Sequence, residues 1–181
     1  MAERIGFDKA DDNEDEGMLQ LVGFDIGDES FGVDILIVQE IIRSATITAV
    51  PNSPEFVEGV INLRGNIIPV VDLRKRLYLY TEESAGRRAW ILILNISDRV
   101  VGFIVDQVTH VIKVSEDSVQ PPPEIVISGL ESQYIQGVCE LDQHLLVILN
   151  FSRVLFNDEY NMLRDLENTE MVLDETMVVV D

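Results

Sequence analysis

Two charged residues stand out as candidates for recognition chemistry, because each lies within a strongly apolar run. They are Glu40 and Arg64. An unpaired charge is costly to bury, so we expect Glu40 to pair with Arg64. On an open surface this pair would contribute about 0–1 kcal/mol, whereas in a partly buried pair the loss of one partner would cost about 3–5 kcal/mol. The pair indicates contact with a partner, and an ordinary surface ion pair is the alternative.

The residue types that usually perform catalysis are sparse and scattered. The two histidines, His110 and His144, fall on separate predicted strands or turns, and with the single Cys139 they give no zinc-ligand spacing. No glycine-rich phosphate loop, nucleophile elbow or zinc-protease motif occurs. We expect Cys139 to be a buried, inert thiol and Asp72 to cap the turn that follows it. The sequence therefore predicts no enzyme, no metal site and no cofactor.

Arg64 lies within residues 59–77, where two β-branched runs flank a short polar break. Such runs, bounded by Gly and Asn, predict two strands joined by a tight turn. Gly65 and Asn66 can take the positive φ that the favoured hairpin turns require. An arginine beside this turn would be held by backbone on both sides.

Short apolar or alternating runs recur along most of the chain and predict strands. We expect strands at 19–26, 31–35, 46–50, 56–63, 67–73, 89–96, 100–105, 110–114, 134–141 and 145–151. Residues 37–44 could form a strand or a helical turn, and residues 81–86 are typical of a linker. Three consecutive prolines exclude a helix at 120–124. The spacing of apolar residues after Phe151 predicts a terminal helix.

The two halves of the chain match each other in their apolar positions. A shift of 70 residues places 19–42 on 89–112, and a shift of 78 places 59–77 on 137–155. The charged positions differ between the copies, which is the pattern of one supersecondary unit used twice. Chance matching of Val- and Ile-rich strands is the alternative.

The copies differ at one informative position. Arg64 in the first copy falls on Asp142 in the second, and Gly65 falls on Gln143. The fold therefore does not require an arginine at this turn. This difference favours a functional role for Arg64.

Each copy would contain about five short strands, and a unit of this size closes most easily as a small antiparallel barrel. The predicted fold is all-β, with two five-stranded barrels packed together. We divide the chain into a flexible acidic tail at 1–17, a first barrel at 18–80, a second barrel at 87–156, and a short C-terminal helix with an acidic tail at 157–181.

The composition argues against several classes of partner. The chain has 181 residues and a net charge of -20, with acidic residues concentrated at both ends. This charge argues against binding to nucleic acid, which needs basic surface, and to anionic lipid. One cysteine permits no intrachain disulfide and fits a reducing, cytoplasmic compartment. No apolar run approaches the about 20 residues that span a bilayer, so we expect no membrane insertion and no signal peptide.

Three segments together resemble the CheW family of bacterial chemotaxis coupling proteins: FGVDILIVQEII, VPNSPEFVEGVINLRGNIIPVVDLRKRL and VGFIVDQVTHVI. The resemblance covers residues 19–155, and its central motif is specific to this family and to the regulatory domain of the chemotaxis kinase CheA. It implies two SH3-like barrels and a non-enzymatic adaptor that joins the cytoplasmic tips of chemoreceptors (methyl-accepting chemotaxis proteins) to CheA. It also implies a cytoplasmic protein, monomeric when isolated, that is recruited to membrane-associated receptor arrays.

By position, the resemblance assigns the ion pair and the groove between the barrels to the receptor, whose helical tip would lie in the groove. The implied receptor-binding residues are Arg64, Glu40, Val38, Ile35, Ile41, Gly59 and Val108. The regulatory domain of the kinase would contact the first barrel near Ile47, Val50 and Phe56.

Three alternative functions remain open. A regulatory fragment of a CheA-like kinase is one, although the chain carries no ATP-binding or phosphoacceptor segment. A coupling protein with an added receiver domain would need roughly 100 more residues. A small hydrolase on a barrel scaffold would need a nucleophile–base constellation, which the sequence lacks.

Overall fold

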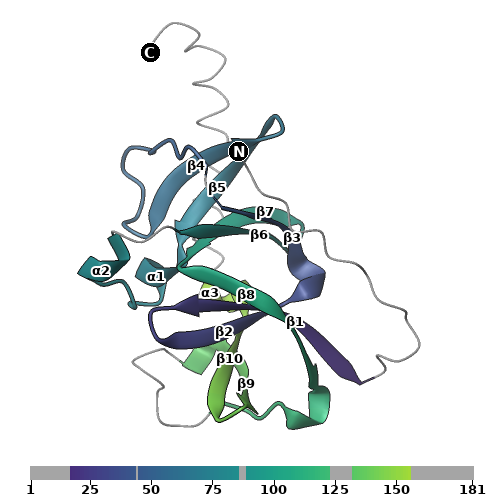
Figure 1. The fold of residues 1–181 in the computed structure, drawn as a ribbon. Coiled ribbons are helices and arrows are strands. Elements are labelled where there is room, and N and C mark those ends of the chain that lie inside the picture. Colours follow the sequence, from purple (N-terminus) through teal and green to yellow (C-terminus); the bar gives the residue numbers. More distant parts are fainter. Residues whose placement is uncertain (1–16, 44, 86–88, 123–131, 156–181) are drawn as a thin grey trace, which may run out of the picture.

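A computed structural model describes residues 17–43, 45–85, 89–122 and 132–155, and these residues form two five-stranded sheets with a few short helices (Figure 1). The strands are β1 (Met18–Ile26), β2 (Glu29–Asp34), β3 (Val38–Ile42), β4 (Val57–Leu63), β5 (Asn66–Asp72), β6 (Trp90–Ile96), β7 (Arg99–Val105), β8 (Gln107–Ser115), β9 (Ile135–Leu141) and β10 (His144–Leu149). The helices are α1 (Leu73–Arg76), α2 (Glu82–Ala85) and α3 (Phe151–Val154), with 3-10 turns η1 (Ile35–Ile37), η2 (Glu116–Ser118) and η4 (Ser132–Tyr134). The prediction of a mostly β protein is confirmed.

Several predicted elements differ from the structure or fall outside its described residues. Of the expected tail at 1–17 all but Gly17 lies outside the described residues, as do the expected helix and tail at 157–181. Residues 46–50 do not form a strand: Thr48 alone pairs, with Val60. The expected linker at 81–86 contains α2. No helix in the described part of the chain is long and apolar enough to cross a membrane.

Along its described strands, the chain crosses between the two sheets twice. Sheet A has the strand order β8-β1-β2-β10-β9, and sheet B has the order β3-β6-β7-β5-β4. The first crossover is η1, between β2 and β3, and the second is the single residue Asp106, between β7 and β8. The sheets therefore differ from the contiguous units expected at 18–80 and 87–156, because each sheet combines strands from both halves.

The two sheets nevertheless repeat one arrangement. Strands β1–β5 followed by α1 correspond to strands β6–β10 followed by α3. In each sheet, the first two strands of one copy pair with the last three strands of the other copy. The parallel registers also agree, since Ile148 is paired with Gly32 in sheet A and Val70 with Gly102 in sheet B. The duplication thus takes the form of a reciprocal exchange of strands.

The core has three parts, and this division explains why many strands are apolar on both faces. Along β6, Leu92 and Leu94 belong to a cluster shared by both sheets, whereas Ile91 and Ile93 belong to a cluster confined to sheet B. A third cluster is confined to sheet A. Strands that are buried on both faces read as continuous apolar runs rather than as alternating ones. Figure 1 shows the two sheets stacked, with the β4–β5 and β9–β10 hairpins at opposite ends of the view.

Among the described residues, neither sheet closes on itself through its backbone ladder. The edge strands are β8 and β9 in sheet A and β3 and β4 in sheet B. The expected pair of five-stranded units is therefore present as two five-stranded sheets.

Candidate functional site

The β4–β5 hairpin ends in a tight turn formed by Arg64 and Gly65. Leu63 pairs with Asn66, and the two residues between them have φ of 54° and 83°. The positive φ angles thus fall at Arg64 and Gly65, one residue earlier than the predicted Gly65 and Asn66. The Asn62 side chain accepts a hydrogen bond from the Gly65 N–H at 2.9 Å, which closes the turn. A positive φ is unfavourable for arginine, so this conformation is imposed by the pairing of β4 with β5. The same pairing therefore sets the direction in which the Arg64 side chain points.

The predicted ion pair between Glu40 and Arg64 is confirmed. Arg64 Nη2 donates to Glu40 Oε1 at 2.8 Å, and 56% of the Arg64 side chain is exposed against 11% of the Glu40 side chain. Glu40 lies on β3 and Arg64 directly follows β4, so the pair bridges the two edge strands of sheet B. Although the Glu40 carboxylate is largely buried, the guanidinium is open to solvent, which screens the pair and limits its contribution to about 0–1 kcal/mol. The guanidinium therefore remains accessible to a partner.

Gly59 allows a close approach of two backbone segments. Its φ is 144°, and a Cβ at this position would overlap the carbonyl of Thr48. Thr48 and Val60 exchange two backbone hydrogen bonds of 2.9 Å beside it. Gly137 repeats this close approach in the second copy, where a Cβ would meet Val119 and Gln120. Because both copies need the glycine, Gly59 is explained by the fold.

The apolar residues assigned to the receptor come from both crossovers, and they differ in exposure. Ile35 and Val38 at the first crossover and Val108 after the second are half-buried against the shared cluster. We call these three residues the seam. Ile41 is only 1% exposed and belongs to the core, because β3 turns this side chain inward. Leu36, in η1, is 85% exposed. The apolar run around it is unbroken, so the sequence pattern did not indicate that this residue faces solvent.

The three residues assigned to the kinase lie in the connection between β3 and β4. Ile47 is half-buried against the sheet B cluster, and Val50 is 8% exposed. Phe56 is half-buried, with the Arg76 guanidinium carbon 5.1 Å from its ring centroid. Ile47 thus packs against the sheet B cluster, whereas Phe56 packs against the cluster shared by both sheets.

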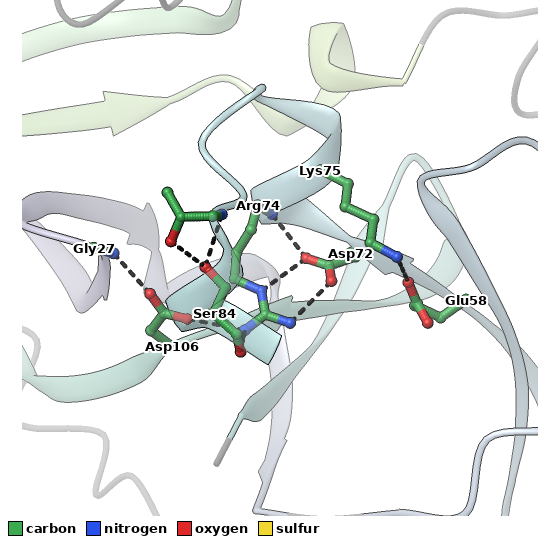
Figure 2. Close-up of polar contacts among 8 residues, drawn as sticks. Gly27, Glu58, Asp72, Arg74, Lys75, Ser84 and Asp106 are labelled. Carbon is green, nitrogen blue, oxygen red and sulfur yellow. Dashed lines mark hydrogen bonds and ion pairs between the residues drawn. The ribbon is translucent and has the colours of Figure 1, made fainter. Parts of the chain in front are cut away.

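A buried charge network beyond β5 was not predicted from the sequence. Asp72 caps α1 as expected, accepting from the Arg74 N–H at 3.0 Å. It also accepts from Arg74 Nε at 3.0 Å and from Nη2 at 2.9 Å, while Nη1 donates to Asp106 Oδ1 at 2.9 Å (Figure 2). Burial alone would lower the pKa of Arg74, but the hydrogen bonds and charges of Asp72 and Asp106 more than offset this and raise it. The arginine therefore stays charged in the interior.

A second, more exposed pair lies beside this network. Lys75 Nζ donates to Glu58 Oε1 at 2.6 Å, and this hydrogen bond raises the pKa of Lys75. The Tyr80 ring lies under both cations, 5.2 Å from the Arg74 guanidinium carbon and 5.1 Å from Lys75 Nζ. The pair links α1 to β4 within sheet B.

The remaining polar candidates are dispersed. His110 and His144 are exposed on β8 and β10, and Cys139 is a buried free thiol on β9. Within the described ranges, no group of three or more His, Cys, Asp or Glu side chains is placed to hold a metal ion.

Comparison with known proteins agrees with this architecture. The family model described as CheW-like domain matches residues 20–159. The chain is 38% identical over 150 residues to chemotaxis protein CheW of Treponema pallidum, across 81% of this chain and 88% of the relative. It is 32% identical over 136 residues to chemotaxis protein CheW of Thermotoga maritima, across 75% of this chain and 87% of the relative.

A solved structure gives the same result. The crystal structure of scaffolding protein TtCheW from Thermoanaerobacter tengcongensis matches with a TM-score of 0.71 and 34% identity, across 78% of this chain and 94% of that chain. The family-model match spans both sheets and both crossovers. The chain therefore belongs to the CheW family.

Proposed function

We propose that this chain, a non-enzymatic chemotaxis coupling adaptor of the CheW family, joins the cytoplasmic tips of chemoreceptors to the histidine kinase CheA. The observation that carries the proposal is the exposed Arg64, held in a fixed turn and paired with Glu40. The second copy has Asp142 at the same turn, so the fold does not account for the arginine. An exposed, oriented arginine is the kind of residue that dominates binding at interfaces.

The receptor side of the proposal combines this arginine with the seam. The seam supplies half-buried apolar side chains from both crossovers, and the exposed Leu36 extends them. Such a surface suits the apolar face of an amphipathic helix, as in helix-in-groove recognition. Ile41 and Gly59 would support this surface from within, since both are buried.

The kinase side of the proposal uses the β3–β4 connection. Ile47, Val50 and Phe56 would meet the regulatory domain of CheA, and all three lie in the connection between β3 and β4 of sheet B. Each sheet would curl as an open SH3-like barrel, and the pair between β3 and the end of β4 supports this for sheet B. The adaptor would act in the cytoplasm, recruited to membrane-associated receptor arrays.

The alternative of a CheA-like regulatory fragment is not favoured. The relatives from Treponema pallidum and Thermotoga maritima, which match over 88% and 87% of their own length, are chemotaxis proteins CheW.

Co-sedimentation of the full chain tests the proposal. One arm contains vesicles that display a receptor cytoplasmic fragment, a second contains purified CheA, and a third contains both. We expect binding in each binary arm and a ternary complex with raised kinase activity in the third. Binding in neither binary arm would refute the adaptor function, and binding in one arm alone would refute the coupling of the two partners.

A further inference from the structure

The buried contacts of Arg74 converge on the crossover from sheet B to sheet A. Arg74 lies on α1, directly after β5 of sheet B, and it holds Asp106, the single residue between β7 and β8. Asp72 accepts two further side-chain hydrogen bonds from the same guanidinium. We call Asp72, Arg74 and Asp106 the clasp.

The clasp also holds a turn of sheet A. The second oxygen of Asp106 accepts from the Gly27 N–H at 2.7 Å, in the turn between β1 and β2. The Asp106 N–H donates to the Asp25 carbonyl at 3.1 Å. Figure 2 shows Asp106 between the Gly27 turn and the Arg74 guanidinium. One carboxylate thus joins an α1 residue on the sheet B side to a hairpin of sheet A.

The clasp is buried, so its geometry is closely constrained. The exposed fraction of the side chain is 7% for Arg74, 7% for Asp106 and 2% for Asp72. Burying such charges is expensive, and apolar residues of similar volume often give equal or greater stability. What the planar guanidinium adds is directional bonding at fixed angles. The clasp is therefore better explained by positioning than by net stability.

The other crossover shows that the fold does not require this device. In the repeat, Leu36 takes the place of Asp106, and Ser152 takes the place of Arg74. Leu36 is 85% exposed and has no counterpart of the buried contact. Two crossovers with the same topology thus differ: among the described residues, buried charges contact the crossover that leads into β8 and not the one that leads into β3.

We propose that the clasp is a positioning device for the receptor-facing seam: by fixing Asp106, it holds the start of β8, and with it Val108, in register with the Glu40–Arg64 pair of sheet B. Val108 is two residues from Asp106 and packs against the cluster shared by both sheets. This inference rests on the proposed receptor docking at the seam. Receptor binding would need both sheets in register, whereas the kinase candidates all lie in the connection between β3 and β4, two strands of sheet B.

The test uses Asp106→Asn in the full chain. An asparagine can accept from Arg74 or from Gly27 through its one oxygen, but not from both as the carboxylate does. The matched control is Glu58→Gln, which also removes one carboxylate but breaks a pair between β4 of sheet B and α1, neither of which is part of sheet A. Spin labels on the exposed positions Gln107 of β8 and Asn66 of β5, in a Cys139→Ala background, report the distance between the two sheets.

We expect a narrow distance distribution in the unmutated chain and in Glu58→Gln, and a broadened one in Asp106→Asn. Affinity for a receptor cytoplasmic fragment should fall about tenfold in Asp106→Asn, while affinity for CheA changes less than about twofold. A merely destabilising change would lower both affinities together. An unchanged distance distribution, or unchanged receptor affinity despite broadening, would overturn the inference.

A second variant covers the case in which Asp106→Asn does not fold. Arg74→Lys keeps the positive charge but loses the planar fork, and it is measured in the same way. If both variants are unfolded at 25 °C, the clasp is a requirement for folding and the positioning role is wrong. If the unmutated chain does not bind the receptor fragment, the proposed docking fails, while the distance measurement still reports on the clasp.

Discussion

Replacing Arg64 with alanine should separate recognition from stability. The Arg64 side chain is 56% exposed, so the lost ion pair corresponds to about 0–1 kcal/mol. Alanine keeps a Cβ at the same φ of 54°, so the strain of the turn is not relieved or increased appreciably. For a chain of this size, 1 kcal/mol lowers the melting temperature by about 2–4 °C. The variant should therefore remain folded at 25 °C.

Receptor binding should respond much more strongly than stability. An arginine that anchors an interface typically contributes about 2 kcal/mol or more, which corresponds to at least a tenfold loss of affinity. We expect Arg64→Ala to lose receptor-dependent kinase activation and to retain direct binding to CheA. Thermal melts, calorimetric titration with a receptor fragment and kinase assays should be run on the same preparation.

The matched control is Asp142→Ala, at the equivalent turn of the second copy. Asp142 is exposed and has a φ of 45°, so its replacement perturbs the same kind of turn. This variant should bind the receptor fragment as the unmutated chain does. The reasoning would be refuted if Arg64→Ala retained full activation, or if Asp142→Ala lost as much affinity.

Three further predictions concern the backbone, the pH dependence and the topology. Gly59→Ala should lower the free energy of unfolding by about 3 kcal/mol, because its Cβ would overlap the Thr48 carbonyl. Gly65→Ala should lower the free energy of unfolding by about 1 kcal/mol, because a Cβ there would meet only open space. Urea titration measures both values. The raised pKa of Lys75 stabilises the fold below about pH 10.4, and this stabilisation is lost as the pH rises through the folded-state pKa. The difference in unfolding free energy between the unmutated chain and Glu58→Gln should therefore be constant near neutral pH and vanish at alkaline pH. Cutting the chain within 86–88 should give pieces that are unfolded alone by circular dichroism and reassemble on mixing, because each sheet needs strands from both; a piece that folds alone would contradict the exchange.

Much of the local structure follows from the sequence, because it depends on neighbouring residues. Apolar β-branched runs between turn residues predicted nine of the ten strands in the described part of the chain at or near their observed places, and the position of β3 was left between strand and turn. The duplication and the ion pair were also predicted, since the repeat appears in the apolar pattern and a charge in an apolar run needs a partner. The cap of α1 by Asp72 was predicted by the same local reasoning.

The exposure of individual side chains was predicted less well. Ile35, Leu36 and Ile41 lie in one apolar run, yet one is half-buried, one is exposed and one is in the core. In a protein whose strands are buried on both faces, an apolar run carries no alternation that separates surface from interior.

The set of strands, their duplication and the family to which the chain belongs follow from the sequence alone. The exchange of strands between the copies, and the clasp that accompanies it, depend on the folded arrangement of the whole chain. The parallel pairs β2–β10 and β5–β7 join segments far apart in the chain, and Arg74 meets Asp106 across 32 residues. Hairpins leave their signature in adjacent residues, whereas pairings at such separations are set by how the whole chain buries its apolar surface, which no local pattern records.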